Sequence, residues 1–293
     1  MFSCRAGLVG AFVVLAFLAV LLAPPPAARA SEMEASTAPQ GAYLIKIYPK
    51  FYYTSAYFDG QGKARNLPDV SGLLYFELPI QVQYGITGRL SIGALLPLGW
   101  TYEELDVEGT NRSRLAIREM WVSGQYRALT FPLIVSVSTL VKIPLADKEP
   151  WEDGLRIGDG QVDVFPVAHF EYDDQTRYWY VQMSTGYKYR FERRGTKLFD
   201  EIRFYGQGGY ELFPDLRMRF YLFADLTKFV NGEFPGGGTQ FFQHKGDLHN
   251  FGYGVSLWPR PTFRVEISTG GDWSGTNQYR GIRWELGFTK IIQ

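Results

Sequence analysis

The chain has 293 residues, of which 46% are hydrophobic and 16% aromatic, and its 30 Lys and Arg residues balance 30 Asp and Glu residues. Without a basic excess, the composition gives no indication of a nucleic-acid partner. Beyond residue 30 there is no uninterrupted run of 18 apolar residues, which argues against membrane-spanning helices in that part of the sequence.

Residues 1–30 resemble a secretory signal peptide. A short basic start is followed by an apolar run over 6–23, and prolines then lead to the small-residue triplet Ala28-Arg29-Ala30. A retained membrane anchor is the alternative, because the run is near the lower length for a spanning helix. We expect cleavage after Ala30, a short periplasmic segment over 31–41 and one domain over 42–293.

From residue 42 onward, apolar and polar side chains alternate with a period of two, and no stretch has helical periodicity. The expected strands cover residues 42–57, 74–84, 90–98, 115–128, 133–143, 162–172, 179–191, 202–212, 218–226, 251–257, 263–267 and 282–288. The alternation is weakest over 115–128, where Arg118 and Glu119 put charge on both faces. The count is therefore about twelve strands.

The links between these segments alternate in length. Short links are expected at 85–88, 128–131, 173–176, 213–216 and 258–261, and long ones at 58–71, 102–113, 146–160, 192–200, 230–247 and 270–279. Bacterial outer-membrane barrels have short periplasmic turns and long external loops. The sequence therefore predicts an all-β fold, a transmembrane antiparallel up-and-down β-barrel with both termini periplasmic. Its partners would be outer-membrane lipid and, during insertion, the barrel-assembly machinery of a Gram-negative-type bacterium.

A soluble β-sandwich or propeller is the alternative fold. The expected strands are longer than the roughly 3–10 residues usual in globular proteins. Charged residues such as Arg217, Arg219 and Asp225 recur on the supposed interior, where a dry core would leave them unpaired. Aromatic residues such as Trp100, Trp179 and Tyr84 lie near strand ends, as membrane interfaces favour.

The hairpin around 173–176 provides a test of register. Closing it there places His169 opposite Tyr180 and Phe165 opposite Ser184, both pairs on polar faces. With a rise of about 3.3 Å per residue, Ser184 is then too far along the strand to bond with His169. We therefore expect His169 to be an ordinary hydrogen-bonded lumenal residue.

Signals for catalysis are weak. The three histidines, His169, His244 and His249, have no zinc-site spacing, and the only cysteine, Cys4, lies in the signal region. Twelve-stranded outer-membrane barrels include a phospholipase with a Ser–His pair on its lipid-facing wall, but no histidine here precedes an outward serine by two residues. The glycine-rich pieces 158–160 and 236–238 lack the helix that a phosphate cradle needs. We expect no enzyme, metal or cofactor.

The polar face of the alternation contains the candidate functional residues. The predicted lumen lining comprises Glu77, Lys142, Asp163, His169, Glu171, Lys188, Arg190, Arg203, Arg217, Arg219, Asp225, Arg264, Glu266, Arg283 and Glu285. These residues could form cross-barrel ion pairs that fill the interior, or they could line a selective pore. About twelve strands predict a narrow or partly occluded lumen.

Three motifs resemble a known family. Residues 84–90, Tyr-Gly-Ile-Thr-Gly-Arg-Leu, with Leu96-Pro97-Leu98, are similar to a hairpin of the outer-membrane transporters linked to the meta-pathway of phenol degradation. Lys142-Ile143-Pro144 with residues 158–164, and Gly186-Tyr187-Lys188-Tyr189-Arg190 with Asp200-Glu201-Ile202, resemble later motifs of that family, although Leu145-Ala146 replaces its usual Thr-Gly. The resemblance spans residues 72–230 and implies passage of small, often apolar or aromatic, molecules.

We therefore expect a channel for the passive passage of small molecules. The alternative is a non-conducting structural or partner-binding barrel that acts through an external loop at 230–247, where Phe234, Phe241 and Phe242 are the candidate contacts. Outer-membrane barrels commonly end on an aromatic residue, whereas this chain continues past Phe288 to Ile291-Ile292-Gln293. The assembly signal would then be a variant, or the last residues would trail into the periplasm.

Overall fold

The computed structural model describes residues 37–67, 70–105, 111–117, 119–145, 160–174, 178–192, 198–213, 217–231, 247–276 and 278–293. The strands are β1 (Tyr43–Ile47), β2 (Lys50–Phe58), β3 (Ala64–Asn66), β4 (Val70–Gly85), β5 (Leu90–Leu105), β6 (Arg112–Ile117), β7 (Glu119–Leu129), β8 (Leu133–Pro144), β9 (Asp163–Asp174), β10 (Trp179–Arg190), β11 (Asp200–Phe213), β12 (Met218–Val230), β13 (Asp247–Arg260), β14 (Phe263–Gly275) and β15 (Gln278–Ile292). Within the described part of the chain, no helix is long and apolar enough to cross a membrane.

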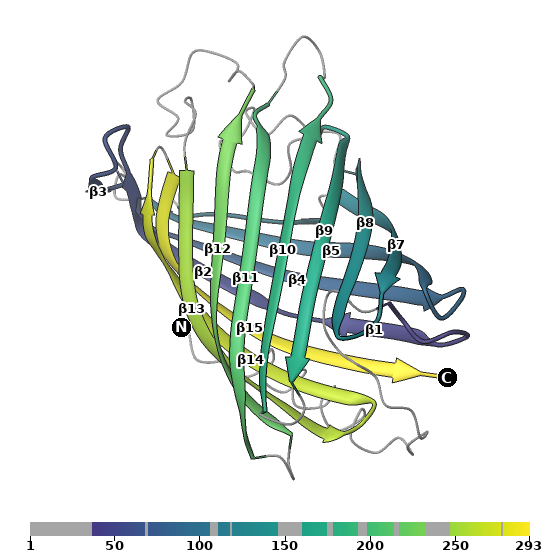
Figure 1. Cartoon of the computed structure of the whole chain (residues 1–293). Helices are drawn as coiled ribbons and strands as arrows, with labels where there is room; N and C mark the ends of the chain where they lie inside the picture. The colour runs from purple at the N-terminus through teal and green to yellow at the C-terminus, as the bar shows by residue number, and fades with distance from the viewer. Residues whose placement is uncertain are drawn as a thin grey trace.

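These strands form one sheet that closes on itself. Successive strands pair antiparallel, and the ring is closed by β1 and β2, which each pair with β15 on one side and β4 on the other. Figure 1 shows the steep tilt that closure requires, with β10 to β13 crossing in front of β4, β5 and β15. The ladders therefore run round the whole ring, although among the described residues β6 pairs with β5 alone.

The wall contains twelve strands, as the sequence predicted. β1 and β2 are two parts of one wall strand, interrupted at Pro49, which has no amide hydrogen to contribute to a ladder. β6 and β7 are likewise two parts of one wall strand, and both pair with β5. β3 pairs with β2 and extends the rim. Leu98 of β5 pairs with Ile117, whereas Leu95 pairs with Trp121, so the register with β5 changes by one residue within the segment 115–128 where the alternation is weak.

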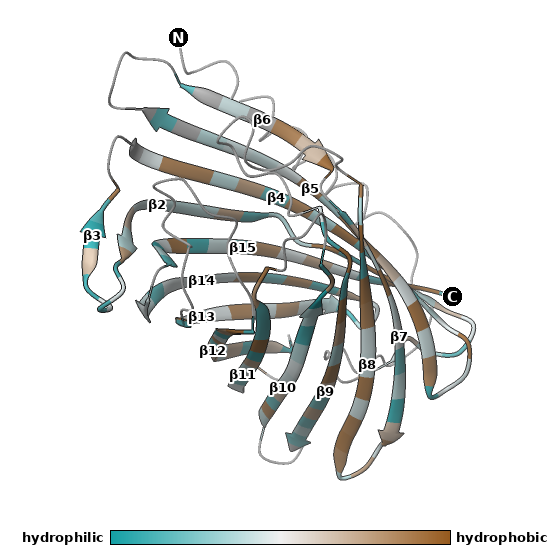
Figure 2. Cartoon of the chain, turned by 90° about the horizontal axis from the view of Figure 1, so that it is seen from above, coloured by the Kyte–Doolittle hydropathy of each residue, from teal (hydrophilic) through white to brown (hydrophobic). Residues whose placement is uncertain are grey.

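The two faces of the wall differ as the alternation predicted. On β14, Ile267 points outward and is 62% exposed, whereas the next residue, Ser268, lines the internal cavity. The same change repeats along the other strands, so brown and teal alternate in the view down the barrel (Figure 2). The apolar outer face suits lipid, and the polar inner face suits water.

Exposed aromatic side chains lie near both ends of the barrel. Tyr43, Tyr126 and Trp179 lie near the end formed by the links 85–90, 129–133 and 174–179, which we call the turn end. Tyr189 and Trp273 lie near the opposite end, which we call the loop end. This arrangement matches the aromatic girdles of membrane barrels.

The structure corrects one prediction about strand ends and bears on another. Residues 270–279 were expected to form a long link, but β14 continues to Gly275 and β15 begins at Gln278. The turn-like composition of Gly270-Gly271-Asp272 had suggested a loop, yet these residues pair in register with β13. Of the two alternatives for the C-terminal residues, the structure disfavours the trailing one, because Leu44 and Ile291 pair in the closing ladder.

The segment before β1 packs against the turn end of the barrel. Ala38 and Ala42 are buried with Leu44 and Ile291, and the Gly41 amide donates to the Gly85 carbonyl over 2.8 Å. The predicted signal peptide and the first part of the predicted 31–41 segment lie outside the described residues.

Candidate functional site: the barrel lumen

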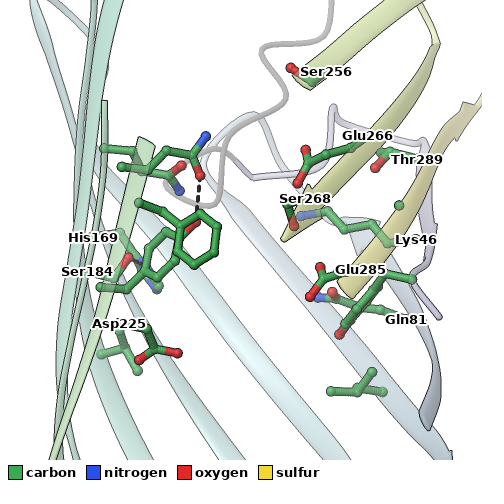
Figure 3. Close-up of a pocket in the computed structure, with 18 of the residues that line it drawn as sticks. Lys46, Gln81, His169, Ser184, Asp225, Ser256, Glu266, Ser268, Glu285 and Thr289 are labelled. Atoms are coloured by element: carbon green, nitrogen blue, oxygen red, sulfur yellow. Dashed lines mark hydrogen bonds between the residues drawn. The ribbon is translucent and has the colours of Figure 1, made fainter. Parts of the chain in front are cut away.

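The interior of the barrel contains a cavity of about 440 Å³, lined by residues from β1, β2, β4, β5 and every strand from β7 to β15. In Figure 3, His169, Ser184 and Asp225 lie on one side of it, and Lys46 and Glu285 lie on the opposite side. The polar face of the alternation therefore surrounds space rather than a packed apolar core.

Neutral hydrogen-bonded side chains cover the wall from β4 to β8. Gln83 donates to Ser91 over 2.8 Å and to Gln125 over 2.9 Å, and Gln125 donates to Ser136 over 3.0 Å. All four residues are buried. These side chains satisfy one another, which holds this part of the wall in one arrangement.

His169 occupies a different register from the one predicted. It pairs with Ser184, and Tyr180 pairs with Asp173, so the hairpin is shifted by four residues. The Ser184 hydroxyl lies 3.0 Å from His169 Nδ1, and the Ser138 hydroxyl lies 2.8 Å from Nε2. The expectation that Ser184 was out of reach is therefore wrong. The expectation that His169 is a hydrogen-bonded lumenal residue is confirmed.

Ion pairs connect β8 to β11 along the wall. Lys142 Nζ lies 2.6 Å from Asp163 Oδ2, and both side chains are buried. Lys188 Nζ lies 2.7 Å from Glu201 Oε1, and the Arg190 guanidinium contacts both Glu201 and Asp163. Three of these contacts, Lys142–Asp163, Lys188–Glu201 and Arg190–Asp163, join residues that lie opposite each other on adjacent strands.

A second charged group lies against aromatic rings near the turn end. Arg219 bonds to Asp173 over 2.9 Å and to Glu211 over 3.1 Å, and its guanidinium lies about 5 Å from the rings of Tyr180 and Trp258. Such stacking on aromatic faces is characteristic of arginine.

Glu266 on β14 contacts two further side chains that line the cavity, Tyr221 and Arg264. It accepts a hydrogen bond from Tyr221 over 2.8 Å and pairs with Arg264 at 3.3 Å. Arg264 also lies 5.8 Å from the ring of Trp258. Aromatic and charged side chains thus share one side of the cavity.

Most other predicted lumen residues occupy the expected face. Glu77 lies opposite Lys50 in the ladder, and Glu285 forms an ion pair with Lys50 at 3.7 Å. Glu171 is buried on β9, two residues from His169. Arg217 is a correction, because it is exposed in the turn before β12 with a φ of 46°. The predicted loop contacts Phe234, Phe241 and Phe242 lie outside the described residues.

Aromatic side chains were not among the residues predicted to line the lumen, although Tyr180 was placed on a polar face. Tyr180, Tyr221 and Phe223 form a buried cluster, with Tyr205 packed against it. The signal was present, because Tyr221 and Phe223 fall at the inward positions between Arg219 and Asp225. The residues predicted to line the lumen were all charged apart from His169, so the rings on the same face were left out.

Glycines on neighbouring strands make room for these rings. A Cβ atom at Gly254 would overlap the ring of Tyr221, and one at Gly252 would overlap the ring of Phe223. The rings therefore lie against the wall over these glycines, which leaves the centre of the barrel less obstructed.

Among the described residues, no cluster of three or more His, Cys, Asp or Glu side chains could hold a metal ion. The lumen offers hydrogen bonds, paired charges and aromatic faces to a solute.

Comparisons with known proteins agree with this architecture. A family model described as the MetA-pathway of phenol degradation matches residues 55–286. An outer membrane channel from Pseudomonas putida F1 superposes with a TM-score of 0.73 at 15% identity, over 90% of this chain and 100% of that one. The NanC porin superposes with a TM-score of 0.50 at 12% identity, over 85% of this chain and 100% of that one. No curated protein sequence matches the chain.

Proposed function

Because the chain belongs to the family described as the MetA-pathway of phenol degradation, we propose that it is an outer-membrane channel giving passive passage to small molecules. The observation that carries this proposal is the cavity of about 440 Å³ inside a closed barrel with an apolar outer face. The proposal places both termini and the short turns in the periplasm and the long loops outside. It involves no catalysis, metal or cofactor.

The direction of the ion pairs favours a channel over a filled structural barrel. Lys142 pairs with Asp163 on the next strand, and Lys188 does the same with Glu201. Two pairs of described residues skip strands, Arg219 on β12 with Asp173 on β9 and Arg283 on β15 with Asp225 on β12, and each joins strands three apart, whereas opposite walls of a twelve-stranded ring are six strands apart. A barrel that used its charges to fill the interior would instead join opposite walls.

The solutes we propose are small molecules that include apolar and aromatic ones. The phenol pathway in the family description supports this class, and so do the rings of Tyr180, Tyr205 and Phe223 that line the cavity. Aromatic side chains offer apolar contact without the charge of the neighbouring arginines. The proposal also includes export of the chain through the signal peptide at residues 1–30. The barrel-assembly machinery then inserts the barrel, and outer-membrane lipid surrounds it.

Swelling of proteoliposomes in solutions of small uncharged solutes tests this function. We expect swelling to be faster than in protein-free vesicles and to slow as solute size increases. A Ser268→Trp variant should slow it further, because Ser268 faces the cavity. Folded protein that swells no faster than empty vesicles would contradict the channel and favour the non-conducting barrel.

A further inference from the structure

A second cavity, of about 280 Å³, lies on the loop-end side of the main cavity and is lined in part by Tyr52 and Thr227. Arg203, Asp225 and Arg283 line both cavities. These three side chains therefore lie where the two cavities meet. A solute moving along the lumen from one cavity to the other would pass them. We call this group the throat.

The throat is held in position by hydrogen bonds to the wall. Asp225 lies 3.2 Å from an Arg203 nitrogen and 3.7 Å from an Arg283 nitrogen. Arg283 also donates to the Asn250 side-chain oxygen over 3.3 Å, and the Asn250 amide donates to Asp272 over 2.9 Å. The positions of the two guanidinium groups are thus fixed by side chains on other strands rather than by solvent.

Asp272 anchors this network on the wall. Its buried carboxylate accepts a hydrogen bond from the Tyr52 hydroxyl over 2.8 Å and another from the Gly281 amide over 3.0 Å. With the Asn250 amide as a third donor, the negative charge is covered by hydrogen bonds. Asp272 therefore offers little attraction to a passing cation.

The throat exposes its positive groups more than its negative one. The exposed fraction of the side chain is 41% for Arg203 and 27% for Arg283, but 12% for Asp225. Arginine remains charged at any physiological pH and presents several donors to a carboxylate. A solute that reaches the throat therefore meets guanidinium groups first.

An aromatic surface adjoins the throat on the side of the main cavity. The Arg283 guanidinium lies 5.6 Å from the centre of the Phe223 ring, and Tyr205 stacks against Phe223 with ring centroids 6.3 Å apart. Both rings line the main cavity. Phe223 is itself buried, so a flat molecule contacts chiefly the partly exposed Tyr205 ring while its anionic group reaches the arginines.

We propose that the throat of Arg203, Asp225 and Arg283 is a selectivity site that binds small aromatic carboxylates through their anionic group. This rests on the proposed channel function and narrows its solute class. The carboxylate exchanges hydrogen bonds with water for charge-assisted bonds with Arg203 and Arg283, and the ring packs on Tyr205, which Phe223 supports from behind. The channel then favours organic anions over cations of the same size.

Planar-bilayer recordings with benzoate and benzylamine test the throat. In a KCl gradient, the wild-type reversal potential should indicate anion preference, and benzoate should reduce chloride current at lower concentration than benzylamine. Arg203→Gln should shift the reversal potential toward cations and weaken the benzoate effect about tenfold, since a hydrogen bond to a charged group contributes about 1.5 kcal/mol or more. Arg217→Gln is the matched control, because this arginine is exposed in the turn before β12 and lines neither cavity, and it should leave the benzoate effect unchanged.

The possible results distinguish a failure of the throat proposal from a failure of the channel proposal. An absence of current from folded protein overturns the channel itself. Current without anion preference, equal effects of benzoate and benzylamine, or equal changes in Arg203→Gln and Arg217→Gln overturn the throat alone. Asp225→Asn provides an opposite check, because losing the carboxylate should strengthen anion preference.

Discussion

Lys142 and Asp163 lie opposite each other across the ladder between β8 and β9, and both side chains are buried. Removing Lys142 leaves the buried Asp163 with the longer contact to Arg190 at 3.9 Å in place of its closest cation, whereas removing both partners leaves neither charge. The two kinds of variant therefore separate the cost of an orphaned charge from the value of the pair.

We expect Lys142→Met to lower the free energy of unfolding by about 3 kcal/mol or more, because Asp163 loses its closest cation. Urea titration of the barrel reconstituted in lipid vesicles measures this change. The double variant Lys142→Met/Asp163→Leu should recover most of the loss. A double variant as unstable as the single one would mean that packing, rather than charge, sets the cost.

Ile267 and Ser268 show the alternation at the scale of one strand. They are neighbours on β14, yet Ile267 is exposed on the outer face and Ser268 lines the cavity. A lysine introduced at each position places the same charge at nearly the same depth on opposite faces of the wall. The comparison therefore tests which face contacts lipid.

We expect Ile267→Lys to destabilise the barrel in a bilayer by about 2–4 kcal/mol, because an ammonium group on the lipid face loses its hydration. Ser268→Lys should cost much less, since the new side chain extends into the polar cavity. Folding titrations in vesicles measure both. Equal costs, or a larger cost for Ser268→Lys, would mean that the two faces are assigned the wrong way round.

The elements also show what alternation can and cannot predict. A shift of four residues in the β9–β10 hairpin leaves every side chain on its predicted face, so the faces of His169 and Ser184 were correct while their pairing was wrong. Pairing depends on where the turn closes, and here the pair nearest the turn between β9 and β10 is Asp174 with Trp179. Period-two patterns are insensitive to shifts by an even number of residues.

Strand ends were harder to predict than strand faces for a related reason. Asp272 and Trp273 lie in a glycine-rich stretch with the composition of a loop, yet Asp272 is bound by Tyr52 and Asn250 from other strands. Contacts of this kind depend on closure of the whole barrel. The sequence therefore predicted twelve strands and most of the charged lumen residues, but it did not predict the throat network or the aromatic cluster.

At the scale of the whole molecule, closure creates the functional space. Because β1 and β2 pair with both β15 and β4, the polar faces of all twelve wall strands converge on one interior. Charged side chains such as Lys142 and Asp163 pair along the wall, and rings such as Tyr221 lie over glycines such as Gly254. Both arrangements keep bulky side chains at the wall and leave a cavity.

The most direct test of the account is single-channel recording of the purified, folded protein in a planar bilayer. We predict discrete steps of current at constant voltage, each step marking the insertion of one barrel, with a smaller step for Ser268→Trp. Folded protein that inserts into the bilayer and carries no current at any voltage would contradict the claim that the lumen is a passage.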